Sequence, residues 1–218
     1  MYLDTSNLKE ISDALETGVI VGVTTNPTIL KKQGKSRVDQ IKSIDELGVP
    51  VIYAQLVGDN ADELFEDYKA LKEIGKELKG ELGIKVPISN VGLKALKKIR
   101  DLDEEILVLG TAIYSADQGI MGALAGCNYL APYYNRMENN ATDPQQEIEK
   151  MRLFIDDRGL ETKILAASFK NSSQVVNALI SGAHTVTIDY SIFLQMTEKD
   201  VALKAIDVFN EHGRSLPK

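Results

Sequence analysis

A lysine interrupts an apolar run in the first half of the chain. Residues 81–89 read ELGIKVPIS, and Lys85 stands between Ile84 and Val86 where the interior of a sheet or barrel is expected. Side chains alternate in direction along a strand, so if Ile84 and Val86 face covering helices, Lys85 points inward. Burial disfavours the ammonium form and leaves a neutral amine that can attack a carbonyl. The resulting imine withdraws electrons from a neighbouring carbon–carbon bond, which is Schiff-base chemistry.

Two structural explanations of Lys85 compete with the catalytic one. Its stem can follow apolar surface until the charged head reaches water. It can also form a buried ion pair with Asp4, although such a pair is a weak source of stability. Two other lysines are rivals for the catalytic role. Lys163 opens its strand at the opposite, N-terminal end, and Lys170 lies in a polar loop beyond the strand, which is a rim position.

Short apolar runs alternate with longer helical patterns along the chain, and this alternation is the main fold signal. Apolar residues at three- and four-residue spacing, such as Leu8, Ile11 and Leu15, indicate amphipathic helices. Strands are expected near residues 2–4, 21–24, 51–55, 84–86, 106–109, 129–131, 163–166 and 185–188. Eight βα units without a composition break predict an α/β fold, with residues 1–218 as a single (β/α)8 TIM barrel domain.

An open, doubly wound sheet is the alternative arrangement. It would bind nucleotide through a Gly-rich turn, but the sequence contains neither GxGxxG nor GxxxxGK[ST]. Residues 198–218 predict one more amphipathic helix, with Ala202, Ile206 and Phe209 on one stripe. No barrel position is left for this extra C-terminal helix. We therefore expect it to pack either across the barrel's own N-terminal end or on a neighbouring subunit.

Catalytic groups of such barrels lie at the carboxyl ends of the strands, and polar residues occur there in seven of the eight units. In chain order they are Asp4; Thr24, Thr25 and Asn26; Gln55; Lys85; Thr111; Tyr133 and Arg136; and Ser168. A phenol such as Tyr133 can donate a proton through water. The planar fork of Arg136 suits phosphate, and Ser168 lies near the seventh strand, where barrels often bind phosphate. Together these residues predict a polar pocket around one buried lysine.

The composition argues against several classes of partner. The net charge of −7 argues against nucleic acid and anionic membranes, which require a concentrated basic face. The apolar stretches are far shorter than the roughly 20 residues that span a bilayer. The N-terminus, MYLDTSN, shows no secretory signal, so we expect a cytoplasmic protein.

The cysteine and histidine residues predict neither a disulfide nor a metal site. Cys127 is the only cysteine, which fits a reducing compartment, and its setting is typical of a structural, half-buried thiol. His184 and His212 stand 28 positions apart, without ligand residues at metal spacing. We therefore expect no metal, and no cofactor motif is present.

Seven motifs, in chain order, resemble the transaldolase family and, within it, the fructose-6-phosphate aldolase subgroup. They are YLDTSN, GVTTNPTIL, AQLV, IKVPIS, LGTAIYSADQG, AGCNYLAPYYNR and ILAASFK, and they cover nearly the whole chain. The resemblance implies a (β/α)8 barrel in which Lys85 forms a Schiff base with a ketose or dihydroxyacetone, without a cofactor. It also implies that Arg136 and Ser168 bind the phosphate of the acceptor.

The same resemblance implies roles for the other polar residues at the strand ends. Asp4 and Asn26 would hold substrate hydroxyls and help to transfer their protons, with Thr24 and Thr25 beside them in the substrate site. Three further residues would hold or act through a catalytic water: Gln55, Thr111 and Tyr133.

Two positions bear on the subgroup. Transaldolases of this family carry Glu and Phe where the chain has Gln55 and Tyr133, so the chain has the aldolase pair. In TIDYSIF, relatives commonly show Leu-Pro or Met-Pro in place of Ile188 and Asp189, which leaves the rim around the eighth strand without an assigned role.

These features predict an aldolase that reversibly cleaves fructose 6-phosphate into dihydroxyacetone and glyceraldehyde 3-phosphate. One alternative is a transaldolase that transfers dihydroxyacetone between sugar phosphates in the pentose phosphate pathway. Another is a non-catalytic phosphosugar-binding barrel. Family resemblance also implies a homo-oligomer, either a ring of five or two stacked rings, with the C-terminal helix reaching a neighbour.

Overall fold

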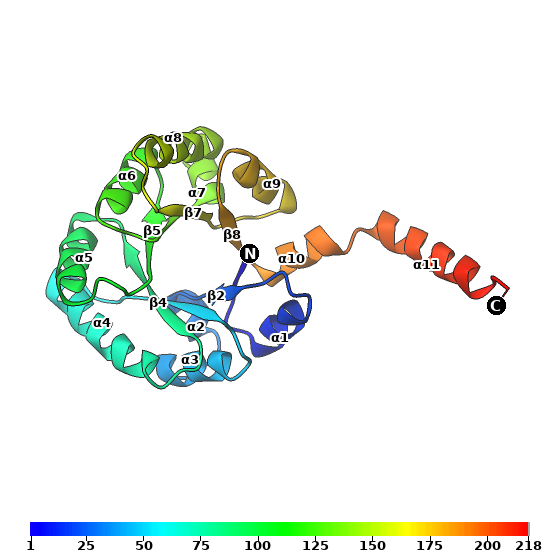
Figure 1. Ribbon diagram of the computed structural model, residues 1–218, viewed down its shortest axis with the longest axis horizontal. Coiled ribbons are helices and arrows are strands. Elements are labelled where there is room, and N and C mark those ends of the chain that lie inside the picture. Colours follow the sequence, from blue (N-terminus) through cyan, green and yellow to red (C-terminus); the bar gives the residue numbers. More distant parts are fainter. Residues whose placement is uncertain (218) are drawn as a thin grey trace.

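Eight parallel strands close into a barrel in the computed structural model, which describes residues 1–217 (Figure 1). Each strand pairs with the next in the sequence, and β8 pairs with β1 to close the sheet. The strands are β1 (Tyr2–Asp4), β2 (Gly22–Thr24), β3 (Val51–Gln55), β4 (Glu81–Pro87), β5 (Val108–Ile113), β6 (Tyr129–Pro132), β7 (Lys163–Ala166) and β8 (Thr185–Ile188). The predicted (β/α)8 barrel is confirmed, and the open sheet is excluded.

Helices connect successive strands and cover the outside of the barrel (Figure 1). They are α1 (Leu8–Glu16), α2 (Pro27–Lys31), α3 (Arg37–Asp45), α4 (Ala61–Gly75), α5 (Asn90–Leu102), α6 (Ala116–Leu124), α7 (Tyr134–Asn139), α8 (Pro144–Asp157) and α9 (Ser172–Ile180). Two more helices, α10 (Tyr190–Thr197) and α11 (Asp200–Arg214), follow the last strand. Several of these helices begin with a polar residue whose side chain caps the first turn. The Asn7 side chain accepts hydrogen bonds from Lys9 N and Glu10 N, and Asp143 caps α8 with Pro144 in its first turn.

Two apolar layers separate the inside of the barrel from the outside. Ile84 and Val86 of β4 belong to the large core between strands and helices. Inside the barrel, the rings of Tyr2, Tyr53 and Tyr129 have centroids 5.9 to 6.3 Å apart. Gly83 makes room for this layer, because a Cβ atom at that position would collide with the Tyr53 ring. The tyrosines fill the barrel beneath the ends of the strands.

The fifth strand ends later than the sequence predicts. We expected a strand near residues 106–109, but β5 spans Val108–Ile113. Its pairing with β6 shifts between Gly110 and Ile113, and Ala112 adopts a positive φ of 56°. This bulge extends the strand, so Thr111 lies within β5 and not after it.

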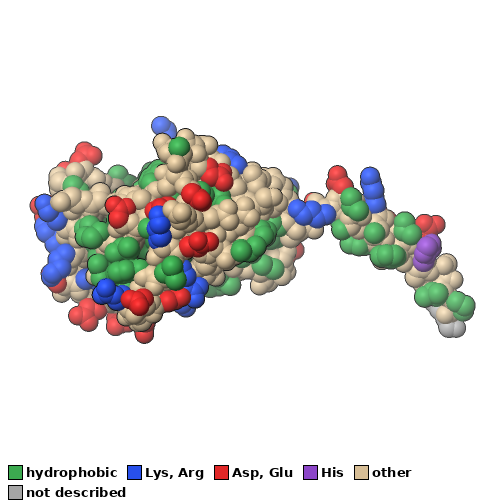
Figure 2. Space-filling view, turned by 90° about the horizontal axis from the view of Figure 1, so that it is seen from above, with side chains coloured by type: hydrophobic (Ala, Val, Ile, Leu, Met, Phe, Trp, Pro, Cys, Tyr) green, Lys and Arg blue, Asp and Glu red, His purple; other side chains and the backbone are tan. Residues whose placement is uncertain are grey.

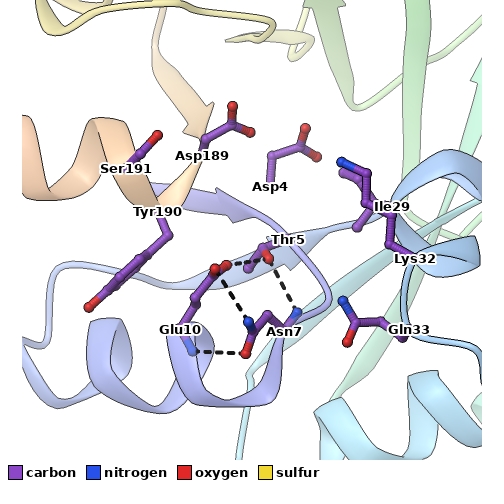
Figure 3. A pocket seen from close by; sticks show the side chains of 10 residues that line it. All are labelled: Asp4, Thr5, Asn7, Glu10, Ile29, Lys32, Gln33, Asp189, Tyr190 and Ser191. Atoms are coloured by element: carbon purple, nitrogen blue, oxygen red, sulfur yellow. Dashed lines mark hydrogen bonds between the residues drawn. The ribbon is translucent and has the colours of Figure 1, made fainter.

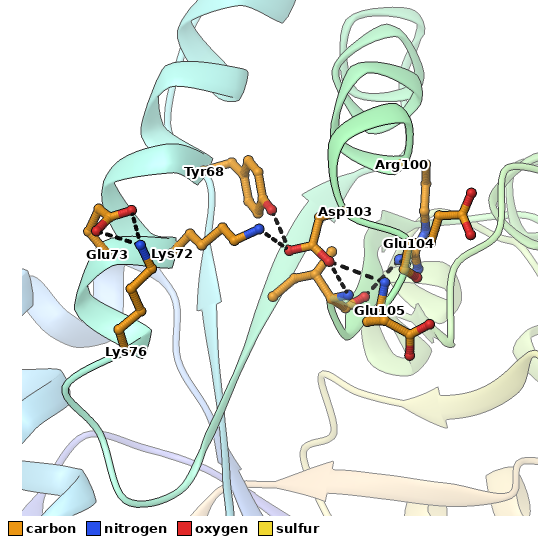
Figure 4. A network of polar contacts seen from close by, with 9 residues as sticks. Tyr68, Lys72, Glu73, Lys76, Arg100, Asp103, Glu104 and Glu105 are labelled. Atoms are coloured by element: carbon orange, nitrogen blue, oxygen red, sulfur yellow. Dashed lines mark hydrogen bonds and ion pairs between the residues drawn. The ribbon is translucent and has the colours of Figure 1, made fainter.

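A polar network outside the barrel joins α4 to the connection between α5 and β5 (Figure 4). Tyr68 OH and Lys72 Nζ each donate to Asp103 Oδ2 at 2.7 Å, and Ile106 N donates to its other oxygen at 3.1 Å. Burial opposes ionisation of Asp103, but these hydrogen bonds outweigh it and lower its pKa to about 2. The network fixes the start of β5 away from the catalytic end.

Helix α11 extends away from the barrel (Figures 1 and 2). None of its residues is buried, and Val201 and Phe209 are 83% and 69% exposed. The alternative in which this helix packs across its own barrel is therefore wrong. Its apolar stripe, which Figure 2 shows as a run of hydrophobic side chains along the arm, is uncovered in the single chain.

Candidate active site

Lys85 points into the barrel from β4 and is only 4% exposed. Its register partners are Gln55 on β3 and Leu109 on β5. Within residues 1–217 the Lys85 amine forms no ion pair, and Asp4 instead accepts a hydrogen bond from Thr24. The buried ion pair between Lys85 and Asp4 is thus absent.

The ends of β1, β2 and β8 share a chain of hydroxyl and carboxylate groups. Thr24 Oγ1 donates to Asp4 Oδ1 at 2.6 Å and lies 2.7 Å from Thr187 Oγ1. Because the single Thr24 hydroxyl proton is committed to Asp4, Thr187 must be the donor to Thr24. This chain orients the Asp4 carboxylate. Sequence analysis did not single out Thr187, although its alternation with the outward-facing Ile188 was available as a signal.

The residues that end β2 and β3 differ in how they are held. Thr25 is fully buried, and its hydroxyl donates to the Tyr53 carbonyl at 2.9 Å. The Asn26 side-chain oxygen accepts from Ile29 N at 3.0 Å and caps α2, which leaves its amide nitrogen available to a substrate oxygen. Gln55 is half-buried and lies beside Lys85 in the sheet register.

Thr111 and Tyr133 form a direct pair, with their hydroxyl oxygens 2.9 Å apart. Tyr133 immediately follows β6, and its ring contacts Tyr114 edge-to-face and lies beneath the Arg136 guanidinium. The Tyr114 ring centroid lies 5.6 Å from that of Tyr133, and the Arg136 guanidinium carbon lies 4.9 Å from the same ring. Arg136 Nη1 donates to Tyr114 OH at 3.0 Å. Tyr114 therefore orients Arg136, a role that sequence analysis missed although LGTAIY contains the residue.

Ser168, two residues after the end of β7, adopts a left-handed backbone conformation. Its φ of 63° is unusual for a residue with a Cβ atom and costs on the order of 1–3 kcal/mol. The Ser168 carbonyl accepts from Asn135 N at 2.9 Å, and the Ala167 carbonyl accepts from Tyr134 N at 2.9 Å. The loop after β7 is thereby joined to the start of α7, the helix that carries Arg136.

A polar pocket of about 320 Å³ opens between the ends of β1 and β8 (Figure 3). Asp4 and Asp189 both line it, with Glu10 and Lys32 among the other lining residues. Asp189 is solvent-exposed, but partial desolvation at the strand end, followed by repulsion from Asp4, raises its pKa above the ordinary value. The rim of the eighth strand, which had no assigned role, therefore places a second carboxylate beside a predicted site residue.

Three further observations concern metal-ligand groups, the cysteine and membrane spans in the described chain. Residues 1–217 contain no group of three or more His, Cys, Asp or Glu side chains arranged to hold a metal ion. The Cys127 thiol is 1% exposed, and burial raises its pKa to about 12, so it is a poor nucleophile. None of the helices in this part of the chain has the length and hydropathy of a membrane span.

Comparisons with known proteins agree with this geometry. A sequence model of the family described as "Transaldolase/Fructose-6-phosphate aldolase" matches residues 1–215. A "Probable fructose-6-phosphate aldolase" of Streptococcus pneumoniae is 39% identical over 212 residues, which cover 96% of this chain and 93% of the relative. A "Probable transaldolase" of Geotalea uraniireducens is 33% identical over 217 residues, 100% of this chain and 99% of the relative. Another "Probable transaldolase", of Thermoanaerobacter sp., is 32% identical over 213 residues, 98% and 96% of the two chains.

Proposed function

Because the chain belongs to the transaldolase/fructose-6-phosphate aldolase family of enzymes, we propose that it is a class I aldolase that reversibly cleaves fructose 6-phosphate into dihydroxyacetone and glyceraldehyde 3-phosphate. The observation that carries this proposal is the state of Lys85. It is 4% exposed, faces the barrel interior and has no ionic partner among the described residues. A desolvated amine in a polar pocket is suited to attack a ketone.

The reaction begins with attack of the Lys85 amine on C2 of the ketose and loss of water to form an imine. The imine accepts the electron pair of the C3–C4 bond as that bond breaks, and the C4 hydroxyl loses its proton to give the aldehyde product. Asp4, oriented by Thr24, is placed to hold substrate hydroxyls and take up such a proton. The first product, glyceraldehyde 3-phosphate, then leaves.

The remaining enamine must gain a proton at carbon before release. The Tyr133 phenol, hydrogen-bonded to Thr111, supplies this proton through a water that Gln55 helps to hold. Hydrolysis of the new imine frees dihydroxyacetone and regenerates the Lys85 amine. Asn26 holds a substrate hydroxyl through its amide, and Thr24 and Thr25 shape this part of the substrate site.

The phosphate of the substrate binds at Arg136 and Ser168. Arg136 is held by Tyr114, and its guanidinium offers several donors in a fixed plane. Ser168 lies on the adjoining loop, linked to the helix of Arg136 through Asn135. Sugar phosphates and dihydroxyacetone are the small-molecule partners that follow from this assignment.

Transaldolase activity is the second candidate, because the relatives at 32% and 33% identity carry that name. Both reactions use the same imine and differ in the fate of the enamine. Gln55 and the Thr111–Tyr133 pair favour the aldolase, since a held water and a phenol promote protonation over transfer. Assaying dihydroxyacetone release from fructose 6-phosphate against its transfer to erythrose 4-phosphate separates the two, and predominant transfer would overturn the aldolase assignment.

Borohydride trapping tests the Schiff base itself. Reduction in the presence of dihydroxyacetone should leave a stable covalent mass that peptide mapping locates on Lys85. Absence of any added mass would instead support a non-catalytic phosphosugar-binding barrel. An adduct on Lys163 or Lys170, both of which are exposed, would keep imine chemistry but reject the proposed site.

The assembly forms part of the same proposal. The uncovered apolar stripe of α11 supports a homo-oligomer, a ring of five or two stacked rings, in which this helix lies on a neighbouring subunit. The single buried cysteine suits work in a reducing cytoplasm.

A further inference from the structure

Gln174 lies in the first turn of α9 and is a buried amide, 7% exposed, between two segments of the candidate active site. Its main-chain N–H donates to the capping side chain of Asn171 at 3.0 Å. This hydrogen bond fixes the backbone of Gln174 independently of the contacts that its side chain makes. This anchoring leaves the amide group with a defined direction.

The Gln174 side chain bonds to both segments at once. Its oxygen accepts from Lys170 N at 2.7 Å, in the loop that follows β7. Its nitrogen donates to Asn135 Oδ1 at 3.1 Å and to Glu138 Oε2 at 2.5 Å, both on α7. An amide has one acceptor end and one donor end, and here each end is assigned to a different segment.

These contacts form a continuous set of hydrogen bonds around Ser168. Asn135 N donates to the Ser168 carbonyl, and the Asn135 side chain accepts from Gln174, which in turn holds the main chain of Lys170. Ser168 is thus held on both sides in its left-handed conformation. Such a conformation persists only where the surroundings enforce it.

We propose that Gln174 is a positioning residue for phosphate recognition, which fixes the Ser168 loop relative to the helix that carries Arg136. This inference rests on the proposed function, because it assumes that Arg136 and Ser168 bind the acceptor phosphate. Gln174 itself touches neither substrate nor the reacting atoms. It acts through the distance between the two phosphate-binding elements, so its loss weakens phosphate binding without affecting imine formation at Lys85.

Steady-state kinetics of aldol synthesis from dihydroxyacetone test this role with two acceptors, glyceraldehyde 3-phosphate and unphosphorylated glyceraldehyde. In Gln174→Ala, KM for the phosphorylated acceptor should rise about tenfold while kcat stays within about twofold, as expected when a binding interaction is lost. KM for glyceraldehyde should change little, and inhibition by inorganic phosphate should weaken in parallel. Equal effects on both acceptors, or none on either, would overturn the proposal.

Gln195→Ala is the matched control. Gln195 is also a glutamine that reaches the start of α9, where its oxygen accepts from Ser172 N at 3.3 Å, but the structure gives it no hydrogen bond to α7. Its removal should leave the ratio of the two KM values unchanged. A double variant, Gln174→Ala with Arg136→Ala, should lose little more phosphate discrimination than Arg136→Ala alone, because the two residues act on one contact.

If Gln174→Ala does not fold, exchanging the amide and carboxylate groups between positions 174 and 138 provides a second test. Gln174→Glu places a carboxylate against Glu138 and should raise KM for the phosphorylated acceptor. Adding Glu138→Gln restores a donor and an acceptor in the opposite order and should return KM toward that of the native enzyme. Failure of this rescue in a folded protein rejects the positioning role. Failure of borohydride trapping in the unmodified enzyme would instead reject the proposed function.

Discussion

The hydroxyl oxygens of Thr111 and Tyr133 lie 2.9 Å apart, and an irregular strand brings them together. Between its register partners Gly110 and Ile113, β5 has two residues where β6 has one. Ala112 absorbs the extra length with its positive φ. The bulge places the Thr111 hydroxyl toward the residue that follows β6. Bulges that re-aim a side chain are common next to active sites.

Replacing Tyr133 by Phe should change the fate of the enamine more than its formation. Without the phenol, protonation through water slows, and dihydroxyacetone release should fall by about 10²-fold or more. Transfer to an aldehyde acceptor needs no such proton, so the ratio of transfer to release should rise. Borohydride trapping on Lys85 should persist. If trapping and release fall together, Tyr133 acts on imine formation and the assignment of its role is wrong.

Asp189→Asn should stabilise the protein at neutral pH. Because the pKa of Asp189 is raised in the folded state, its ionised form is less favourable there than in the unfolded chain. The destabilisation caused by ionised Asp189 is fully present above the raised pKa and decreases as pH falls through it. It is absent below the ordinary pKa of 3.8. The variant's Tm advantage, measured by calorimetry, should follow this course. Asp59→Asn, at another exposed position, serves as control, and an equal gain there would show that the stabilisation does not come from the raised pKa of Asp189.

The sequence predicted which residues occupy the strand ends far better than it predicted how they contact each other. The alternating direction of side chains along β4 was sufficient to predict that Lys85 points inward, because its neighbours Ile84 and Val86 both face outward. The Thr111–Tyr133 pair depends on a bulge, and the Thr24–Thr187 contact on closure of β8 against β1. Both are consequences of tertiary packing that a local pattern does not encode. The hydrogen bonds from the Gln174 side chain to α7 join residues 39 and 36 positions apart and could not be predicted from a local pattern either.

Deleting residues 198–218 should reduce the native mass of the protein. The stripe on α11 exposes Ile206 and Phe209, and apolar surface of this kind is typically covered by a partner. A milder change, Phe209→Ser, should shift the assembly toward smaller species, measured by light scattering across a dilution series. Glu211→Ala, on the same exposed helix, should not. An unchanged native mass after the deletion would contradict the proposed role of α11 between subunits.

Lys85→Met should abolish catalysis and raise stability together. The Lys85 side chain is largely buried and its amine has no ion-pair partner among the described residues, whereas methionine fills a similar volume with an apolar side chain. We expect the free energy of unfolding to rise by about 1–3 kcal/mol, since burying a polar group without a hydrogen-bond partner costs about that much. For a chain of this size that corresponds to a Tm increase of roughly 2–4 °C per kcal/mol. Lys163→Met, at an exposed position, should leave activity and Tm nearly unchanged. An inactive Lys85→Met protein with lowered Tm would mean that the lysine supports the fold and is not retained for its chemistry at the expense of stability.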